Sequence, residues 1–161
     1  MAILQPHLLI GPQSSWYVQQ KYIYNYKTTA STPLYVHLKT NLIGATTYNM
    51  WMFEAVGYNY GTGQNIRCAW SFHISTAGSP YTNGFLYNIG LDQEYNGLNP
   101  HGVYIASDGY IVLRSYAASM YYCGFTINAY STRSDVTQSL VDIIAVAQVD
   151  DPGNYYGGPV Q

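Results

Sequence analysis

Charged residues are scarce in this chain of 161 residues: they make up 9% of the sequence, against about 25% in an average globular domain. The six Lys and Arg residues are scattered singly, and the formal net charge is -2. A nucleic-acid-binding protein needs a basic patch to neutralise phosphates, so we expect no nucleic-acid partner. So little charge also means that uncharged polar groups or partner proteins must cover the surface, which disfavours a freely diffusing enzyme.

Cysteine and long apolar runs are also scarce. The two cysteines, Cys68 and Cys123, could pair in an oxidising compartment, although a chain of this length does not need a disulfide to fold. No apolar run approaches the roughly 20 residues of a membrane-spanning helix, so we expect no membrane insertion. The N-terminal stretch lacks a basic leader and is interrupted by Pro6, which predicts no signal peptide. We therefore expect assembly in a cytoplasm, with both thiols reduced.

Strand-forming sequence with frequent turns makes up the rest of the chain. Gly and Pro recur throughout, and the segments between them are rich in Tyr, Val, Ile, Thr and Trp, without a helical period. The predicted strands are 7–10, 15–26, 33–42, 47–59, 64–75, 84–92, 103–107, 110–117, 120–130 and 140–149. Many short antiparallel strands without helices predict an all-β fold, namely an antiparallel two-sheet β-sandwich resembling a jelly roll, over residues 1–150.

Alternation of apolar and polar side chains is most regular in residues 64–75, where every second residue is apolar. One buried face is therefore predicted, and it includes Cys68. The same pattern in residues 120–130 places Cys123 on a buried face, where a small inert thiol is the ordinary expectation.

Turn signals separate the predicted strands. Asp108-Gly109 predicts a two-residue hairpin turn. Residues 76–83 and 95–102 each contain Gly and Pro and are predicted to be exposed loops. The last segment, 151–161, is too rich in Gly and Pro to form a strand, and we expect it to be extended or bound to a partner.

The segment from Met50 to Tyr60 carries apolar side chains on both faces, which indicates burial on both sides. In a small sandwich, a neighbouring subunit can supply the second cover. The predicted subunit-interface residues are therefore Trp51, Phe53, Tyr58 and Tyr60.

No catalytic constellation emerges from the sequence. The four histidines match no metal-ligand spacing, and neither a phosphate-binding loop nor a Gly-x-Ser-x-Gly motif occurs. Asp92 and Glu94 could offer carboxylates to a hard cation, but a solvated loop end explains them equally well. Only two glutamates, Glu54 and Glu94, are available for the carboxylate pair of a glycosidase. We expect no catalytic residue, no metal, no cofactor and no enzyme activity.

Tyrosine is the residue in excess, with 19 copies. Its ring gives a large contact area at a small entropy cost and its hydroxyl forms hydrogen bonds, which suits both subunit interfaces and sugar-binding platforms. Ordinary packing within sheets also accounts for many single tyrosines. Because loops on a rigid scaffold often carry binding residues, the candidate glycan-binding residues are Tyr81, Tyr87, Tyr95 and His101.

Three segments carry a family resemblance. They are Trp51-Met52-Phe53-Glu54-Ala55-Val56-Gly57-Tyr58-Asn59-Tyr60-Gly61, Ser107-Asp108-Gly109-Tyr110-Ile111-Val112-Leu113-Arg114 and Tyr122-Cys123-Gly124-Phe125. Together they resemble a recurrent domain of bacteriophage virion proteins, especially tail-fibre or structural proteins of phages that infect cyanobacteria and marine bacteria. The resemblance covers residues 33–132, and its motifs mark strands and a hairpin. It implies a β-sandwich head, often trimeric, carried on a fibre or projecting from the particle.

The leading hypothesis is thus a phage virion protein, assembled in the host cytoplasm, that forms a homotrimeric fibre or spike head and recognises a host surface glycan. Its expected partners are its own copies, other virion proteins and the glycan. The alternative is a capsid decoration protein with a structural role, attached through its N-terminal segment or through Tyr155 and Tyr156. A free bacterial lectin and a glycan-degrading enzyme have weaker support.

Overall fold

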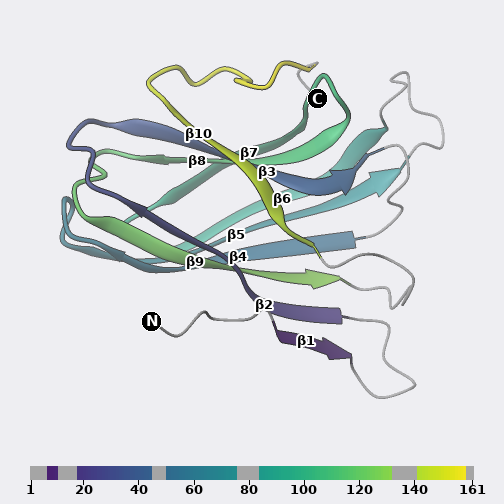
Figure 1. Cartoon of the computed structure of the whole chain (residues 1–161), viewed down its shortest axis with the longest axis horizontal. Coiled ribbons are helices and arrows are strands. Elements are labelled where there is room, and N and C mark those ends of the chain that lie inside the picture. Colours follow the sequence, from purple (N-terminus) through teal and green to yellow (C-terminus); the bar gives the residue numbers. More distant parts are fainter. Residues whose placement is uncertain (1–6, 11–17, 45–49, 76–83, 132–140, 159–161) are drawn as a thin grey trace.

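The computed structural model describes residues 7–10, 18–44, 50–75, 84–131 and 141–158. These residues form ten strands and no helix, and Figure 1 shows the strands in two layers. The strands are β1 (His7–Ile10), β2 (Val18–Thr28), β3 (Leu34–Ile43), β4 (Met50–Asn59), β5 (Gln64–Ser75), β6 (Phe85–Asn96), β7 (Asn99–Ile105), β8 (Tyr110–Ala117), β9 (Cys123–Ser131) and β10 (Ile143–Val149). The predicted all-β sandwich is confirmed.

Two antiparallel sheets form the sandwich. The larger sheet has the strand order β1-β2-β9-β4-β5-β6, and the smaller has the order β10-β3-β8-β7. Strands far apart in sequence pair in nested fashion, β2 with β9 and β3 with β8, as in jelly rolls. By contrast, β4, β5 and β6 pair consecutively as a meander.

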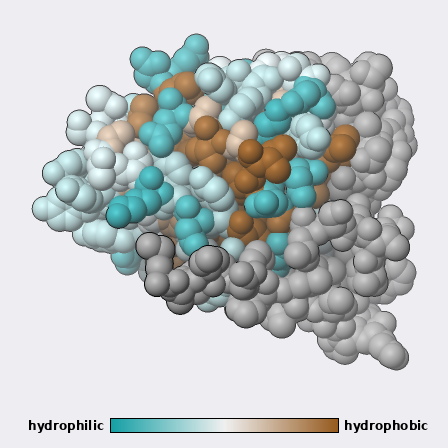
Figure 2. Space-filling view, viewed as in Figure 1, coloured by the Kyte–Doolittle hydropathy of each residue, from teal (hydrophilic) through white to brown (hydrophobic). Residues whose placement is uncertain are grey.

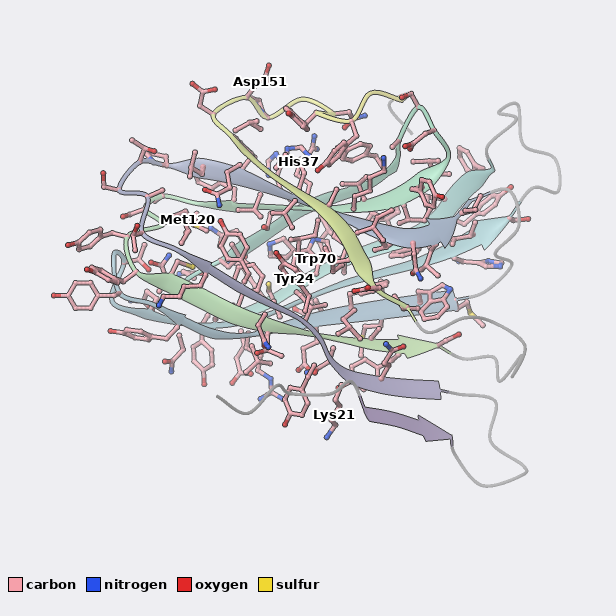
Figure 3. All side chains as sticks on the ribbon, in the orientation of Figure 1. Lys21, Tyr24, His37, Trp70, Met120 and Asp151 are labelled. Carbon is pink, nitrogen blue, oxygen red and sulfur yellow. The ribbon has the colours of Figure 1, made fainter. Side chains whose placement is uncertain are left out.

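The core lies between the sheets and consists of the alternating apolar side chains expected from the sequence. Trp70 on β5 is fully enclosed between the two layers (Figure 3), and its indole Nε1 donates to the carbonyl oxygen of Arg114 in the smaller sheet at 2.9 Å. This bond satisfies the one polar atom of a large buried ring. Cys68 and Cys123 are buried with free thiols, on the inner faces predicted for them.

The hairpin between β7 and β8 lies where Asp108 and Gly109 predict it, but its geometry differs. The amide of Gly109 donates to the carbonyl oxygen of Ala106, and the amide of Ala106 donates to the carbonyl oxygen of Tyr110. Within the turn only Gly109 has a positive φ, of 88°. The connection is therefore a three-residue type I turn with a glycine bulge, rather than a two-residue turn.

The predicted exposed loop at residues 95–102 is wrong, because β6 and β7 occupy this range apart from Gly97 and Leu98. Both connecting residues are buried, and the Nδ2 of Asn59 donates to the carbonyl oxygen of Gly97 at 2.8 Å. Pro100 is tolerated because β7 is an edge strand with a bulge beside this residue, where an amide donor is not required.

Residues 150–158, here called the strap, lie across the outer face of the smaller sheet, where Figure 1 shows them in yellow. Arg114 on β8 holds Asn154 through an Nη1–Oδ1 hydrogen bond of 3.2 Å. Under the strap, His37 faces outward from β3 yet is fully buried, and its Nδ1 lies 2.9 Å from the hydroxyl of Tyr104. Figure 3 shows His37 between the sheet and the strap, on the side where Asp151 lies. The sequence pattern predicts the outward direction of His37 but not its cover.

Stability should depend on pH through His37. Burial lowers the pKa of His37 from 6.5 to about 4, with the Arg114 guanidinium as the second cause; the Asp151 carboxylate opposes the shift and His101 adds slightly to it. The pKa of His37 is lower in the folded protein than in the unfolded chain, so the unfolded chain takes up a proton first as the pH falls. The free energy of unfolding is therefore unaffected by this group above pH 6.5 and decreases as the pH falls from 6.5 toward 4. Over that window we expect the free energy of unfolding to fall by at most about 3 kcal/mol through this group.

Urea unfolding of the native chain and of His37→Gln, measured at several pH values, checks this expectation. Between pH 6.5 and 4 the free energy of unfolding of the variant should change less with pH than that of the native chain, whatever the absolute stability of the variant. Identical pH dependence in both proteins would contradict the role given to His37.

Close approach of β4 and β9 depends on Gly57. A Cβ atom at Gly57 would lie 2.1 Å from the carbonyl oxygen of Gly124, whereas one at Gly124 would lie 3.5 Å from the carbonyl oxygen of Tyr26. We expect Gly57→Ala to lower the free energy of unfolding by about 1–3 kcal/mol, because the strands must separate. The matched variant Gly124→Ala should cost under about 1 kcal/mol in chemical denaturation, since its Cβ has room. Equal losses would show that the strand contact is not the cause.

Candidate functional site

The outer face of the larger sheet carries a row of exposed apolar side chains along β4. Their exposed fractions lie between 38% and 52%, and the residues are Met50, Met52, Val56 and Tyr58. We call them the β4 row. The alternate residues of the strand face inward, and all of them except Gly57 are buried. Glu54 occupies the same face between Met52 and Val56, so the row is apolar on either side of one carboxylate. Exposed apolar residues gathered on one face of a sheet are typical of a surface that contacts another molecule.

An apolar hollow of about 390 Å³ lies at the Met50 end of the row. Its lining combines Met50 and Met52 with His73 from β5 and Tyr130 from β9. His73 in turn packs against Tyr87 of β6, with ring centroids 6.0 Å apart. The hollow therefore combines large apolar surfaces with a few polar groups, the usual composition of a small-ligand site.

A charged hollow of about 350 Å³ adjoins the first and shares Met52 with it. Arg67 lies between two carboxylates: its Nε is 3.5 Å from Oε1 of Glu54, and its Nη1 is 3.2 Å from Oε2 of Glu94. Asp92 adds a third carboxylate to the lining. Both ion pairs involve the largely exposed Arg67 side chain, so they stabilise the fold only weakly.

Further hydrogen bonds hold Glu54 in place. The hydroxyl of Tyr130 donates to Oε2 of Glu54 at 3.1 Å, and the Nδ2 of Asn128 donates to the same oxygen at 3.5 Å. At the other side of the hollow, a hydrogen bond to Glu94 raises the pKa of Tyr95, and the carboxylate charge adds to the effect. The carboxylates thus come from two strands, β4 for Glu54 and β6 for Asp92 and Glu94, and the register of both strands with β5 aligns them.

The four predicted glycan-binding residues do not come together. Tyr81 and the predicted loop that contains it lie outside the described residues. Tyr87 and Tyr95 lie at opposite ends of β6, so they are strand residues rather than loop residues. His101 lies on β7 in the other sheet, where its ring centroid is 5.1 Å from that of Tyr35.

The four predicted interface residues divide into two pairs. Trp51 is 7% exposed and Phe53 is fully buried, and both belong to the core between the sheets. Their cover is the chain itself, so they leave no surface for a neighbouring subunit. Tyr58 and Tyr60 are exposed, Tyr58 within the β4 row and Tyr60 just beyond the end of the strand.

Sequence reasoning missed the charged hollow, although a signal was present. Glu54 and Arg67 occupy outward positions in two strands whose alternation is legible from the sequence. What the sequence does not give is the strand pairing, which places Glu54 opposite Ala69 and Arg67 opposite both Val56 and Tyr95.

These features define a class of protein: an all-β two-sheet sandwich in which residues 150–158 cover one outer face, while no other described segment covers the opposite face. Among the described residues, no group of three or more His, Cys, Asp and Glu side chains could hold a metal ion, and no helix could span a membrane. A scan against family models found no match, and searches of curated proteins and of solved structures found none either.

Cysteine chemistry at this site should be absent. Cys68 lines the charged hollow, but burial raises the pKa of its thiol to about 12, with the Glu54 carboxylate adding to the shift. Burial also raises the pKa of the Cys123 thiol to about 12. Because the thiolate is the reactive form, we expect neither cysteine to react with Ellman's reagent at pH 8 in the native protein, and both to react in guanidinium chloride. Rapid labelling of the native chain would contradict this expectation.

Proposed function

We propose that this chain is a non-catalytic recognition domain of a bacteriophage particle, a fibre or spike head that binds a host surface glycan. The binding surface in this proposal is the outer face of the larger sheet. The observation that carries it is the adjacency of the apolar hollow to the Glu54–Arg67–Glu94 network. The low charge of the chain and the family resemblance of residues 33–132 support the virion context.

Carbohydrate chemistry suits this surface. A sugar ring has apolar C–H faces that pack on large apolar side chains, which Met50, Met52 and Tyr130 supply. Its hydroxyl groups form charge-assisted hydrogen bonds with carboxylates and guanidinium groups, which are stronger than those between neutral partners. Glu54 and Arg67 offer both kinds of charged partner within one hollow.

Binding is favoured over hydrolysis by the position of Arg67. A glycosidase needs one carboxyl group that donates a proton and a second that acts as base or nucleophile. Here the same guanidinium group pairs with both Glu54 and Glu94. Both carboxylates are thus engaged as acceptors by one cation, an arrangement that suits the binding of a polar ligand.

Self-association into a homotrimer belongs to the same proposal. Tyr58 and Tyr60 stand out from the sheet, 48% and 61% exposed, and aromatic side chains of this kind are enriched in subunit interfaces. Closed cyclic symmetry would allow identical copies to cover them.

A capsid decoration protein is the second candidate, and the length of the β4 row favours it. Four exposed apolar residues along one strand suit a protein contact as well as a glycan. In that case the β4 row would bind capsid protein and the charged hollow would remain without a ligand. Attachment through Tyr155 and Tyr156 is less suitable, because the backbone of Tyr156 is already hydrogen-bonded to Ser107 and Tyr104 of the sandwich face.

A glycan array probed with the native chain, followed by calorimetric titration of the best binders, tests the proposal. Glu54→Gln and Arg67→Gln should each weaken binding by at least about tenfold, since each removes a hydrogen bond to a charged group. Asp150→Asn is the matched control for Glu54→Gln, because it removes one negative charge from an exposed residue at the start of the strap. The affinity for the glycan should not change in this variant.

Absence of any glycan bound above background by the folded protein would reject the carbohydrate function. Equal affinities for all three variants would place the glycan site elsewhere on the surface. Retention on purified capsids with no glycan binding would favour the decoration protein.

A further inference from the structure

The strap docks through specific polar contacts. Arg114 donates from Nη1 to the carbonyl oxygen of Pro152 and to Oδ1 of Asn154. The amide of Tyr156 donates to the hydroxyl of Tyr104 at 3.3 Å. The carbonyl oxygen of Tyr156 accepts from both the amide and the hydroxyl of Ser107, at 3.3 and 3.1 Å. Both backbone groups of Tyr156 are therefore satisfied by the face beneath, as in a peptide-binding site.

The ring of Tyr156 occupies a small apolar site of its own. It packs against Tyr104, Ala106 and Val112, which form a cluster separate from the main core. The Nζ of Lys39 lies 4.9 Å from the centroid of the Tyr156 ring, a cation–π contact. The site is built on strands of the smaller sheet and on the hairpin that follows β7, so the sandwich positions it independently of the strap.

Two glycines complete the fit. Gly157 and Gly158 have positive φ values of 70° and 103°. A Cβ atom at Gly158 would lie 2.0 Å from the carbonyl oxygen of Ile105, so only glycine allows the backbone to approach this closely. The face therefore recognises a segment of the form Asn-Tyr-Tyr-Gly-Gly, which residues 154–158 supply.

The strap lies at the surface of the sandwich. Its first four residues, 150–153, which follow β10, are all exposed, and Tyr155 is 57% exposed. Beneath it, the Nε2 of the buried His37 has no hydrogen-bond partner. Few apolar groups anchor the strap, so its release would leave the main core between the sheets intact.

The strand that precedes the strap, β10, lies at an edge of the smaller sheet. β10 ends the smaller sheet, and Figure 2 shows apolar side chains gathered along it. Ile144 on β10 is 49% exposed, and Ile43, at the end of the neighbouring β3, is 37% exposed. An apolar edge strand favours association with another chain.

We propose that the outer face of the smaller sheet is a peptide-binding site, and that in the assembled protein it is filled by the strap of a second copy lying along the β10 edge. Exchange costs little, because the contacts within one chain and between two chains are the same. The proposal rests on the self-association proposed above and gives it a mechanism. It does not depend on glycan binding.

Cysteine cross-linking between copies tests the exchange. The position of a Cβ atom at Gly157 is 3.3 Å from the Cβ of Ser107, close to the spacing in a disulfide. Ser107→Cys and Gly157→Cys chains, carrying different tags, are co-expressed and oxidised, and the products are separated on a non-reducing gel. The native thiols give no background, since Cys68 and Cys123 are buried. Pairing Ser107→Cys with Gly153→Cys, in the exposed link, is the matched control.

A covalent dimer that carries both tags, absent from the control pair, is the expected result. The double variant Ser107→Cys/Gly157→Cys should then give species at multiples of 18.0 kDa. Cross-linking of the double variant only within single chains would overturn the exchange. Light scattering on the native chain distinguishes failure of strap exchange from failure of self-association. If the native chain is an oligomer but no dimer carrying both tags forms, only the exchange is rejected. If the native chain is a monomer, self-association is rejected as well.

Discussion

Mutual burial of the two inner sheet faces is the interaction on which the rest of this structure depends. The chain has few charged residues, and its two cysteines are free thiols. Its stability therefore comes mainly from the apolar surface that these two faces remove from water. Trp70 illustrates the constraint, because its ring fills the space between the layers and its indole nitrogen bonds to the opposite sheet. The strands are thereby fixed in register, and every outward side chain takes its position from that register.

The two outer faces of the sandwich differ in what covers them. The face of the smaller sheet is covered by the strap, which buries a histidine and gives it a tyrosine hydroxyl as partner. The face of the larger sheet has no such cover among the described residues, and it exposes methionine, valine and tyrosine beside three carboxylates and one guanidinium group. A chain with a low overall charge thus concentrates four charged groups at one hollow. That concentration, together with the adjacent apolar hollow, is the basis for proposing recognition rather than a purely structural role.

Local pattern predicted much of the fold because alternation is a local property. The inner face of β5, the buried positions of Cys68 and Cys123 and the location of the hairpin at Gly109 all follow from side-chain period and turn chemistry. The error at residues 95–102 has a non-local cause: proline and glycine read as loop residues, but the edge position of β7 tolerates them.

The candidate site was less accessible to the sequence, since its members come from strands that only pairing brings together. Tyr87 and Tyr95 were predicted from residue type and an expected loop position, whereas Glu54 and Arg67 come together only through the register between β4, β5 and β6. Trp51 and Phe53 show the opposite case: apolar residues on both faces of β4 do not reveal which face the second sheet covers.

The sequence by itself determined that this protein is an all-β sandwich with buried apolar faces on regularly alternating strands such as β5 and β9, because the two-residue period of a strand is visible in consecutive side chains. Only the tertiary structure decided which strands are neighbours and which outer face residues 150–158 cover. The physical reason is that these outcomes depend on contacts between residues far apart in the chain, such as Tyr104 with Tyr156 and Glu54 with Arg67, whose energies arise only once the sheets have formed.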